Sequence, residues 1–167
     1  IFEWFENYVG KGNVRDGQEI YYKIKYEKSD IEMQLTRQAA KISDYMIEGM
    51  LSVMKPGMLE TQVAQWGYAI ASELGCEELG FDVMVTAGEA NRSIVGKALN
   101  RPIQEGDFVT MDFGASYKGY CADMTRTVAV GEVSSKQAEV YETVLEAQLK
   151  GLEAIKAGVP CRDVDAV

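Results

Sequence analysis

The spacing of apolar residues predicts two helices in the first half of the chain. Apolar side chains recur at helical intervals after Ser29-x-x-Glu32, a capping box that predicts a helix start, and Lys55-Pro56-Gly57 predicts the end of that helix. A second helix is expected from about Leu59 to Leu74, with Gly75 as its C-terminal cap. The first helix is expected to bury Ile31, Leu35, Ile42, Met46, Met50, Val53 and Met54, and the second to bury Val63, Trp66, Ile70 and Leu74.

The pattern changes at Phe81, where residues typical of strands replace the helical spacing. Strands are predicted at Asp82–Thr86, Phe108–Met111 and Thr125–Val130, with a turn at Gly88. A second capping box, Ser134-x-x-Gln137, predicts a third long helix that ends at Lys156-Ala157-Gly158. The inner face of this helix is expected to consist of Val140, Tyr141, Val144, Leu145, Leu152 and Ile155.

Residues 1–26 are expected to form the tail of a preceding domain or a linker, followed by a strand that leads into the first helix. Lys23 and Lys25 alternate with Tyr22, Ile24 and Tyr26, a period of two that is typical of a half-buried strand with a solvated lysine face. We prefer this interpretation to a basic patch that binds nucleic acid.

A short internal repeat links the ends of the first and third helices. Residues 51–63 and 152–164 align without gaps, with identical residues at four of thirteen positions: Leu51/Leu152, Lys55/Lys156, Gly57/Gly158 and Val63/Val164. Helix stops that contain Lys and Gly are common, so convergence is an open alternative. If the repeat is real, the sequence is a fragment of a pseudo-symmetric domain about twice as long.

Composition restricts the chemistry that these residues can perform. The 167 residues suit one domain, and a net charge of -9 opposes contact with phosphate backbones. The sequence contains no histidine, which excludes a Ser-His-Asp triad, an HExxH zinc helix and a zinc finger with paired histidines. Cys76, Cys121 and Cys161 are odd in number and widely spaced, which favours a reduced, cytoplasmic setting. No apolar run is long enough to suggest a membrane span.

Two aspartates dominate the segment from Val109 to Gly131. A hairpin centred between Tyr117 and Lys118 would place Asp112 directly opposite Asp123, with Cβ atoms about 4.5–5.5 Å apart. Carboxylates this close share a proton or hold a cation between them, and hard divalent cations prefer oxygen ligands. Alternatively, one aspartate caps a turn while the other is solvated. Tyr-Lys is also a poor hairpin turn, and a slip of one residue would place the two side chains on opposite faces. Spacing alone leaves these alternatives open.

The same segment resembles the signature of a known enzyme family. Asp112-x-Gly114, followed by Gly119-Tyr120-x-x-Asp123-x-Thr125-Arg126-Thr127, resembles the hairpin motif of the pita-bread metallopeptidases, which include aminopeptidase P, prolidase, methionine aminopeptidase and the creatinase relatives. The resemblance covers roughly residues 25–167, and Thr-Arg-Thr favours the aminopeptidase P and prolidase branch. Further matches are Lys25, Glu27, Lys55-Pro56-Gly57-Met58, Phe81-Asp82, Gly106-Asp107, Tyr141, Ala147-Gln148 and Lys156-x-Gly158.

The resemblance implies an α+β fold, the first half of a pseudo-symmetric pita-bread domain in which helices pack on an antiparallel curved sheet, here over residues 27–167. It implies that Asp112 and Asp123 bind metal in a dinuclear centre of Mn, Co or Zn. The remaining ligands in the family, one His and two Glu, belong to the second half, so this fragment alone is not expected to hold a competent site. No catalytic or substrate-binding residue is assigned.

The function implied is a metal-dependent hydrolase of peptide C–N bonds, of the Xaa-Pro aminopeptidase or dipeptidase kind. Following the family, we expect a peptide substrate and a homodimer. In the family, peptidases usually carry a histidine about eleven residues before the Gly-Asp pair, and this sequence has Val95 at that position. Arg92, Lys97 or Arg101 could instead recognise an anionic group, although solvated loop charges are the favoured interpretation. The alternatives are a non-catalytic pita-bread binding module and a creatinase-like amidinohydrolase without metal.

Overall fold

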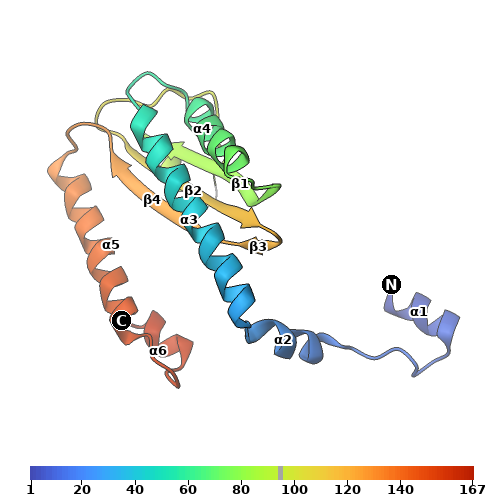
Figure 1. Ribbon diagram of the computed structural model, residues 1–167. Coiled ribbons are helices and arrows are strands. Elements are labelled where there is room, and N and C mark those ends of the chain that lie inside the picture. The colour runs from blue at the N-terminus through green and yellow to red at the C-terminus, as the bar shows by residue number, and fades with distance from the viewer. Residues whose placement is uncertain (94–95) are drawn as a thin grey trace.

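The computed structural model describes residues 1–93 and 96–167 of the chain (Figure 1). These residues contain eleven helices and strands, joined by turns and loops. In chain order they are α1 (Phe2–Val9), α2 (Gln18–Tyr26), α3 (Asp30–Val53), α4 (Glu60–Glu73), β1 (Glu78–Ala87), the 3-10 helix η1 (Gly88–Arg92), β2 (Phe108–Tyr117), β3 (Tyr120–Cys121), β4 (Met124–Ala129), α5 (Ser135–Ala154) and α6 (Cys161–Asp165).

The sheet is built around β2, which pairs antiparallel with every other strand. Strand β1 lies along one edge of β2, while β4 and then β3 lie along the other edge. Helices α3 and α4 pack on the sheet, mainly against β2 and β1. The expected α+β class, with helices on an antiparallel sheet, is confirmed.

The two faces of β2 differ in polarity. Val109, Met111 and Phe113 point into the core that the sheet forms with α3 and α4, because successive side chains of a strand alternate between faces. Thr110 and Asp112 therefore point to the opposite face, away from those helices. Asp112 and its cross-strand partner Thr125, both in the predicted motif, thus lie on the face of the sheet that α3 and α4 leave uncovered.

The predicted limits of the first two helices are confirmed, but part of the predicted core is wrong. Ser29 and Glu32 form the expected capping box of α3. In α4, Trp66 is 48% exposed, and small residues such as Gly67 face the core instead. A Cβ on Gly67 would lie 3.0 Å from the sulfur of Met50. The helices therefore pack too closely for a large residue at this contact, and the buried stripe runs through Val63, Ala64, Gly67 and Ala71.

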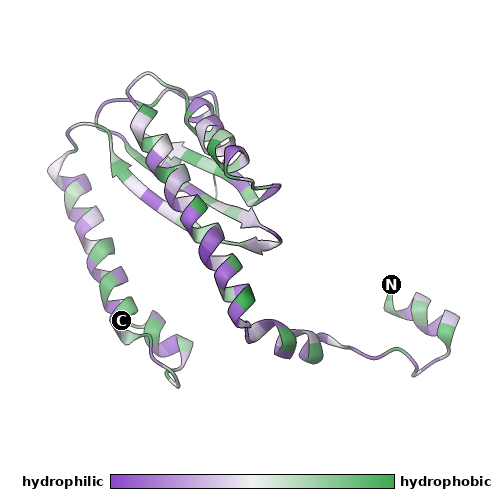
Figure 2. Ribbon diagram, viewed as in Figure 1, coloured by the Kyte–Doolittle hydropathy of each residue, from purple (hydrophilic) through white to green (hydrophobic). Residues whose placement is uncertain are grey.

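The predicted third helix begins at its Ser134 cap, as expected, but the face predicted to be its inner face is not buried in this chain. No residue of α5 is buried, and Val144 is 63% exposed. Figure 1 shows α5 beside the sheet rather than across it, and Figure 2 shows hydrophobic residues along the helix. Phe108 of β2 reaches Tyr141, where the rings stack 5.6 Å apart, and the rest of this apolar face lines an open hollow that it shares with residues of β2 and β4.

The strand expected before the first helix is also wrong, because Gln18–Tyr26 forms α2. No described strand lies beside this segment, and a helix satisfies its own backbone hydrogen bonds where an unpaired strand cannot. Tyr22 and Tyr26, one turn apart, stack at 5.5 Å, and Lys25 lies over the ring of Tyr21. The alternation of tyrosine and lysine is therefore accommodated on a helix surface. The division of the chain at residue 26 stays a prediction.

The internal repeat has a common local structure. Gly57 and Gly158 have φ angles of 89° and 88°. One residue further on, the amide of Met58 donates to Lys55 O at 3.2 Å and that of Val159 donates to Lys156 O at 3.1 Å. Each turn joins the end of a long helix to the start of another. The shared conformation supports a structural repeat over chance identity.

Among the residues that the structure describes, no helix combines the length and apolarity needed to cross a membrane.

Candidate metal centre

The hairpin that carries the two aspartates turns one residue later than predicted. Lys118 and Gly119 form the tip with φ angles of 51° and 81°, as in a two-residue type I′ turn, and Tyr117 pairs with Tyr120. Asp112 consequently pairs with Thr125, so the prediction that Asp112 and Asp123 are directly opposed is wrong. The glycine decides the register, because it adopts a positive φ without strain and the Tyr-Lys pair does not.

The corrected register nevertheless keeps the two aspartates on one face. Partner residues move by two positions relative to the prediction, and side chains alternate with a period of two. The register is the same before and after the break between β3 and β4, where Asp123 lies. Asp123 is therefore a diagonal neighbour of Asp112 on the same side of the ribbon. A shift of the pairing by one position would have put the two side chains on opposite faces, but the pairing shifts by two positions.

Gly114 lets the two arms of the hairpin approach closely beside the aspartates. A Cβ at Gly114 would lie 2.0 Å from the carbonyl oxygen of Ala122, the residue before Asp123. The amide of Ala122 donates to Ala115 O at 2.9 Å, which holds the arms together at this point. Only glycine fits between the arms here.

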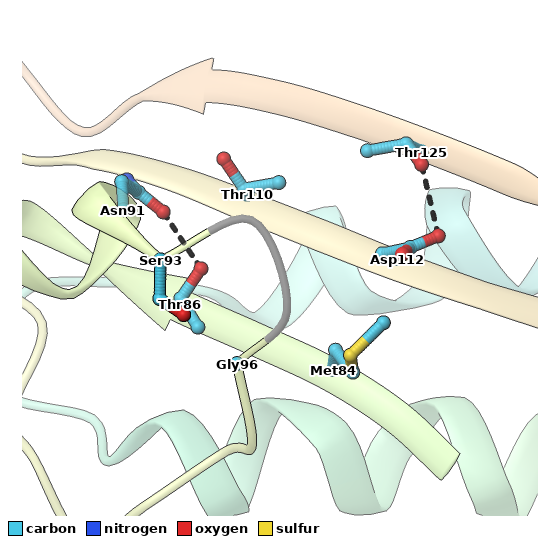
Figure 3. A pocket seen from close by; sticks show the side chains of 8 residues that line it. All are labelled: Met84, Thr86, Asn91, Ser93, Gly96, Thr110, Asp112 and Thr125. Atoms are coloured by element: carbon cyan, nitrogen blue, oxygen red, sulfur yellow. Dashed lines mark hydrogen bonds between the residues drawn. The ribbon is translucent and has the colours of Figure 1, made fainter. Parts of the chain in front are cut away.

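The two carboxylates differ in exposure but not in the kind of atom they offer. Asp112 is half-buried, and its Oδ1 accepts a hydrogen bond of 2.8 Å from the Thr125 hydroxyl (Figure 3). Asp123 is exposed, and its oxygens accept no hydrogen bond from any described residue. Within the described part of the chain, neither aspartate forms an ion pair with Lys or Arg. Oxygen donors of this kind suit a hard divalent cation.

A pocket of about 330 Å³ opens beside Asp112 on the same face of the sheet. Thr86 donates to Asn91 Oδ1 at 2.7 Å, and Asn91 Nδ2 donates to Phe108 O at 2.7 Å, which ties η1 to β1 and β2. Its lining, drawn in Figure 3, consists of Met84, Thr86, Asn91, Ser93, Gly96, Thr110, Asp112 and Thr125. The volume lies in the range of small-molecule sites, and the polar lining suits a substrate that carries amide groups.

Tyr120, in the predicted motif, ties the tip of the hairpin to the start of α3. Its hydroxyl donates to Glu32 Oε1 at 3.0 Å. Hydrogen bonds from the Ser29 backbone, the Ser29 hydroxyl and Tyr120 lower the pKa of Glu32 below its ordinary value. The same contact raises the pKa of Tyr120, because the Glu32 carboxylate accepts a hydrogen bond from the neutral phenol and so favours that form.

The cationic residues considered for substrate recognition do not line this pocket. Arg92 is 82% exposed and lies 3.6 Å from Glu89. Arg101 pairs with Glu60, and Lys97 lines a separate hollow. No Lys or Arg is among the described residues that line the pocket beside Asp112. Val95, where the family usually has a histidine, lies outside the described residues.

Sequence analysis missed two buried polar side chains. Glu60, in the first turn of α4, is fully buried, although an acidic residue at that position is usually an exposed partner of the helix dipole. Ser43 of α3 is also fully buried, and the amide of Ala115 in β2 donates to its Oγ at 3.1 Å. Ser43 lies in helical register with Ala39, Met46 and Met50, a signal that could have placed it on the core face.

The aspartates form an incomplete ligand set in this part of the chain. No cluster of three or more His, Cys, Asp or Glu side chains suited to a metal ion occurs among the described residues. Zinc sites commonly use three or four protein ligands, so Asp112 and Asp123 would need partners from elsewhere.

The sequence and the fold identify a family. Residues 34–167 match metallopeptidase family M24, and the chain belongs to this family. It is 40% identical over 145 residues to the uncharacterized peptidase YqhT of Bacillus subtilis, a match that covers 87% of this chain and 41% of that protein. It superposes on an Xaa-Pro dipeptidase from Bacillus anthracis with a TM-score of 0.86 and 42% identity, over 91% of this chain and 42% of the dipeptidase. Prolidase from Pyrococcus furiosus matches with a TM-score of 0.92 and 29% identity, over 99% of this chain and 50% of the prolidase.

The chain thus spans about two fifths of the length of the curated relatives it matches and about half of the prolidase. Its helices and open antiparallel sheet match half of the pita-bread fold of that enzyme. The resemblance to the aminopeptidase P and prolidase branch, and the expected half of a pita-bread fold, are confirmed.

Proposed function

We propose that the full-length protein is a metal-dependent hydrolase of peptide C–N bonds, of the Xaa-Pro aminopeptidase or dipeptidase kind, in which Asp112 and Asp123 hold divalent metal ions. The observation that carries the proposal is the position of both carboxylates on one face of the hairpin, with Asp112 lining a polar pocket and neither carboxylate paired with a described cation. Membership of a peptidase family and the names of the matched dipeptidase and prolidase support the choice of substrate.

The residues of this chain would bind and orient the ions and the substrate. The Thr125 hydroxyl holds one oxygen of Asp112 and thereby orients its carboxylate. The pocket walls, Asn91 and Thr110 among them, offer hydrogen-bonding groups to a peptide. Bound divalent ions supply Lewis-acid chemistry, which polarises the scissile carbonyl and lowers the pKa of water. We propose Mn, Co or Zn as the metal, and we assign the general acid–base group and the other ligands to the rest of the protein.

The test is Asp112→Asn in the full-length protein, with Asp44→Asn as the matched control, since Asp44 is an exposed residue of α3 that does not line the pocket. Loss of a metal ligand should lower the metal bound per chain and reduce the hydrolysis of an Xaa-Pro dipeptide at least about 100-fold. Metal content by plasma mass spectrometry and kcat/KM are measured on the same samples. Wild-type values of both in the Asp112 variant would refute the assignment.

The same samples separate the alternatives. Metal binding without hydrolysis of any peptide tested would favour the non-catalytic binding module. Hydrolysis that survives complete chelation would favour a creatinase-like reaction without metal. We also propose that the protein is a homodimer, which sedimentation equilibrium of the full-length protein tests, and that it is cytoplasmic.

A further inference from the structure

Glu60 is a buried carboxylate to which the proposed reaction gives no role. The residue is 0% exposed, which is rare for a carboxylate unless its oxygens are paired. Its Oε1 accepts a hydrogen bond from the Ala87 amide at 2.8 Å, and its Oε2 accepts one from the Leu99 amide at 3.0 Å. The guanidinium of Arg101 completes the cluster, with Nε 3.1 Å from Oε1 and Nη2 3.4 Å from Oε2.

The backbone around Glu60 also forms hydrogen bonds with the segment that contains Arg101 and Ile103. The Glu60 amide donates to Arg101 O at 3.0 Å. In the turn before Glu60, the amide of Gly57 donates to Ile103 O at 2.8 Å, and the amide of Ile103 donates to Met58 O at 2.8 Å. The turn between α3 and α4 and the segment up to Ile103 therefore run side by side, and the Glu60 side chain links both to the end of β1.

The two amides that Glu60 binds flank one wall of the pocket. Ala87 is the last residue of β1, and Leu99 follows Gly96 closely in the chain. Between these two anchors lie Asn91, Ser93 and Gly96, which line the pocket with Asp112 (Figure 3). One carboxylate thus holds both ends of the stretch that supplies this wall, while Asp112 lies on the sheet.

Removing the Glu60 carboxylate would remove one hydrogen bond from each end of the wall. Two buried or half-buried amides would lose their acceptor, and a buried donor without a partner is costly. The Nε of Arg101 is itself buried and makes no hydrogen bond within the described residues, so its charge is balanced by the ion pair with Glu60. Glu60 therefore adds a hydrogen bond at each end of the wall to the bonds that Asn91 makes with the sheet.

We infer that Glu60, together with Arg101, is a positioning residue: it fixes the wall that carries Asn91, Ser93 and Gly96 relative to Asp112, and so sets the affinity for substrate. The inference rests on the proposed function for its effect on catalysis. Its effect on the wall is independent of that function. Because Glu60 does not line the pocket beside Asp112, its loss should weaken substrate binding and leave the metal in place.

The experiment compares Glu60→Gln with Glu73→Gln in the full-length protein. Glu73 is an exposed residue at the other end of α4, so its variant controls for the loss of one carboxylate from the same helix. A glutamine at position 60 keeps one acceptor and turns an NH₂ group toward the remaining donors. We expect KM for an Xaa-Pro dipeptide to rise about tenfold, with kcat changed less and metal content unchanged. Glu73→Gln should match wild type.

Hydrogen exchange tests the wall without reference to activity. In Glu60→Gln, peptides that contain Ala87 and Leu99 should exchange at least about tenfold faster, while peptides from β2 and α3 should be unchanged. Arg101→Lys is the second variant; its side chain is 39% exposed and tolerates change, so it should show a smaller shift in the same peptides if Glu60→Gln does not fold.

The outcomes are distinct. Unchanged exchange at Ala87 and Leu99 in a folded variant would overturn the inference. Faster exchange with an unchanged KM would overturn the link to substrate affinity. A wild-type protein that neither binds metal nor hydrolyses peptides would refute the proposed function, while the exchange comparison would still decide whether Glu60 holds the wall.

Discussion

Gly114→Ala is the sharpest test of the hairpin geometry on which the proposed metal centre depends. The added Cβ would lie 2.0 Å from Ala122 O, 3.0 Å from Ala122 C and 3.3 Å from a ring carbon of Phe81. Backbone atoms of a neighbouring strand cannot rotate away as a side chain can. To reach even 3.0 Å from the oxygen, the two arms must separate by about 1 Å.

The displacement acts next to Asp123, which follows Ala122 in the chain. Forcing an extra carbon into a well-packed site costs about 1–3 kcal/mol of unfolding free energy. A shift of about 1 Å between groups that act together can lower activity about 100-fold. We therefore expect Gly114→Ala to unfold at a lower urea concentration than wild type. In the full-length protein we also expect weaker metal binding under conditions in which the variant is still folded.

Gly80→Ala is the matched control, because Gly80 lies in β1 of the same sheet and a Cβ there would meet Cys121 at an ordinary 3.5 Å. Its unfolding free energy should change by less than about 1 kcal/mol. Urea denaturation and metal titration are compared for both variants. If Gly114→Ala behaved like Gly80→Ala in both measurements, the close approach of the hairpin arms would not be needed to place the aspartates.

Two further predictions concern contacts that support the hairpin. Ser43→Ala should lower the unfolding free energy by about 1–3 kcal/mol, because the buried amide of Ala115 loses its acceptor. The control, Ser52→Ala on the exposed side of α3, should lower it by less than about 0.5 kcal/mol. Equal urea midpoints for the two variants would contradict this prediction. Tyr120→Phe should raise the pKa of Glu32 toward its ordinary value. Since the folded pKa is lowered, Glu32 stabilises the fold above its ordinary pKa, and this contribution is lost as pH falls through the lowered value. The variant should lose less stability on acidification, and an NMR titration of Glu32 that gives the same pKa in both proteins would count against the contact.

Local signals explain which parts of the fold could be predicted. Ser29 and Ser134 begin helices in this structure because a capping box satisfies backbone donors within a few residues of the chain. The helices end at Val53 and Ala154, where the next residue is extended, and Gly57 and Gly158 adopt positive φ angles in the short turn that follows each end. These interactions depend on neighbours in sequence, and the predicted limits hold to within a residue or two.

The predictions that failed required knowledge of what lies next to each segment. Tyr22 to Tyr26 has the alternation of a strand, yet forms a helix because no described strand lies beside it. Trp66 has the right spacing for the core of α4, but the close contact of Gly67 with Met50 turns it outward. The apolar residues of α5 identify a face correctly, and only the structure shows that none of them is buried.

In the candidate site, too, some features follow from the local sequence and others from tertiary structure. By itself, the sequence determined that Asp112 and Asp123 belong to one hairpin, and the motif around them pointed to the family that the match confirms. Tertiary structure decided their relation, because the turn at Lys118-Gly119 sets the pairing while the period of two in a strand keeps both side chains on one face. It also decided the role of Glu60, since the burial of a carboxylate depends on segments distant in the chain and no pattern of neighbouring residues records it.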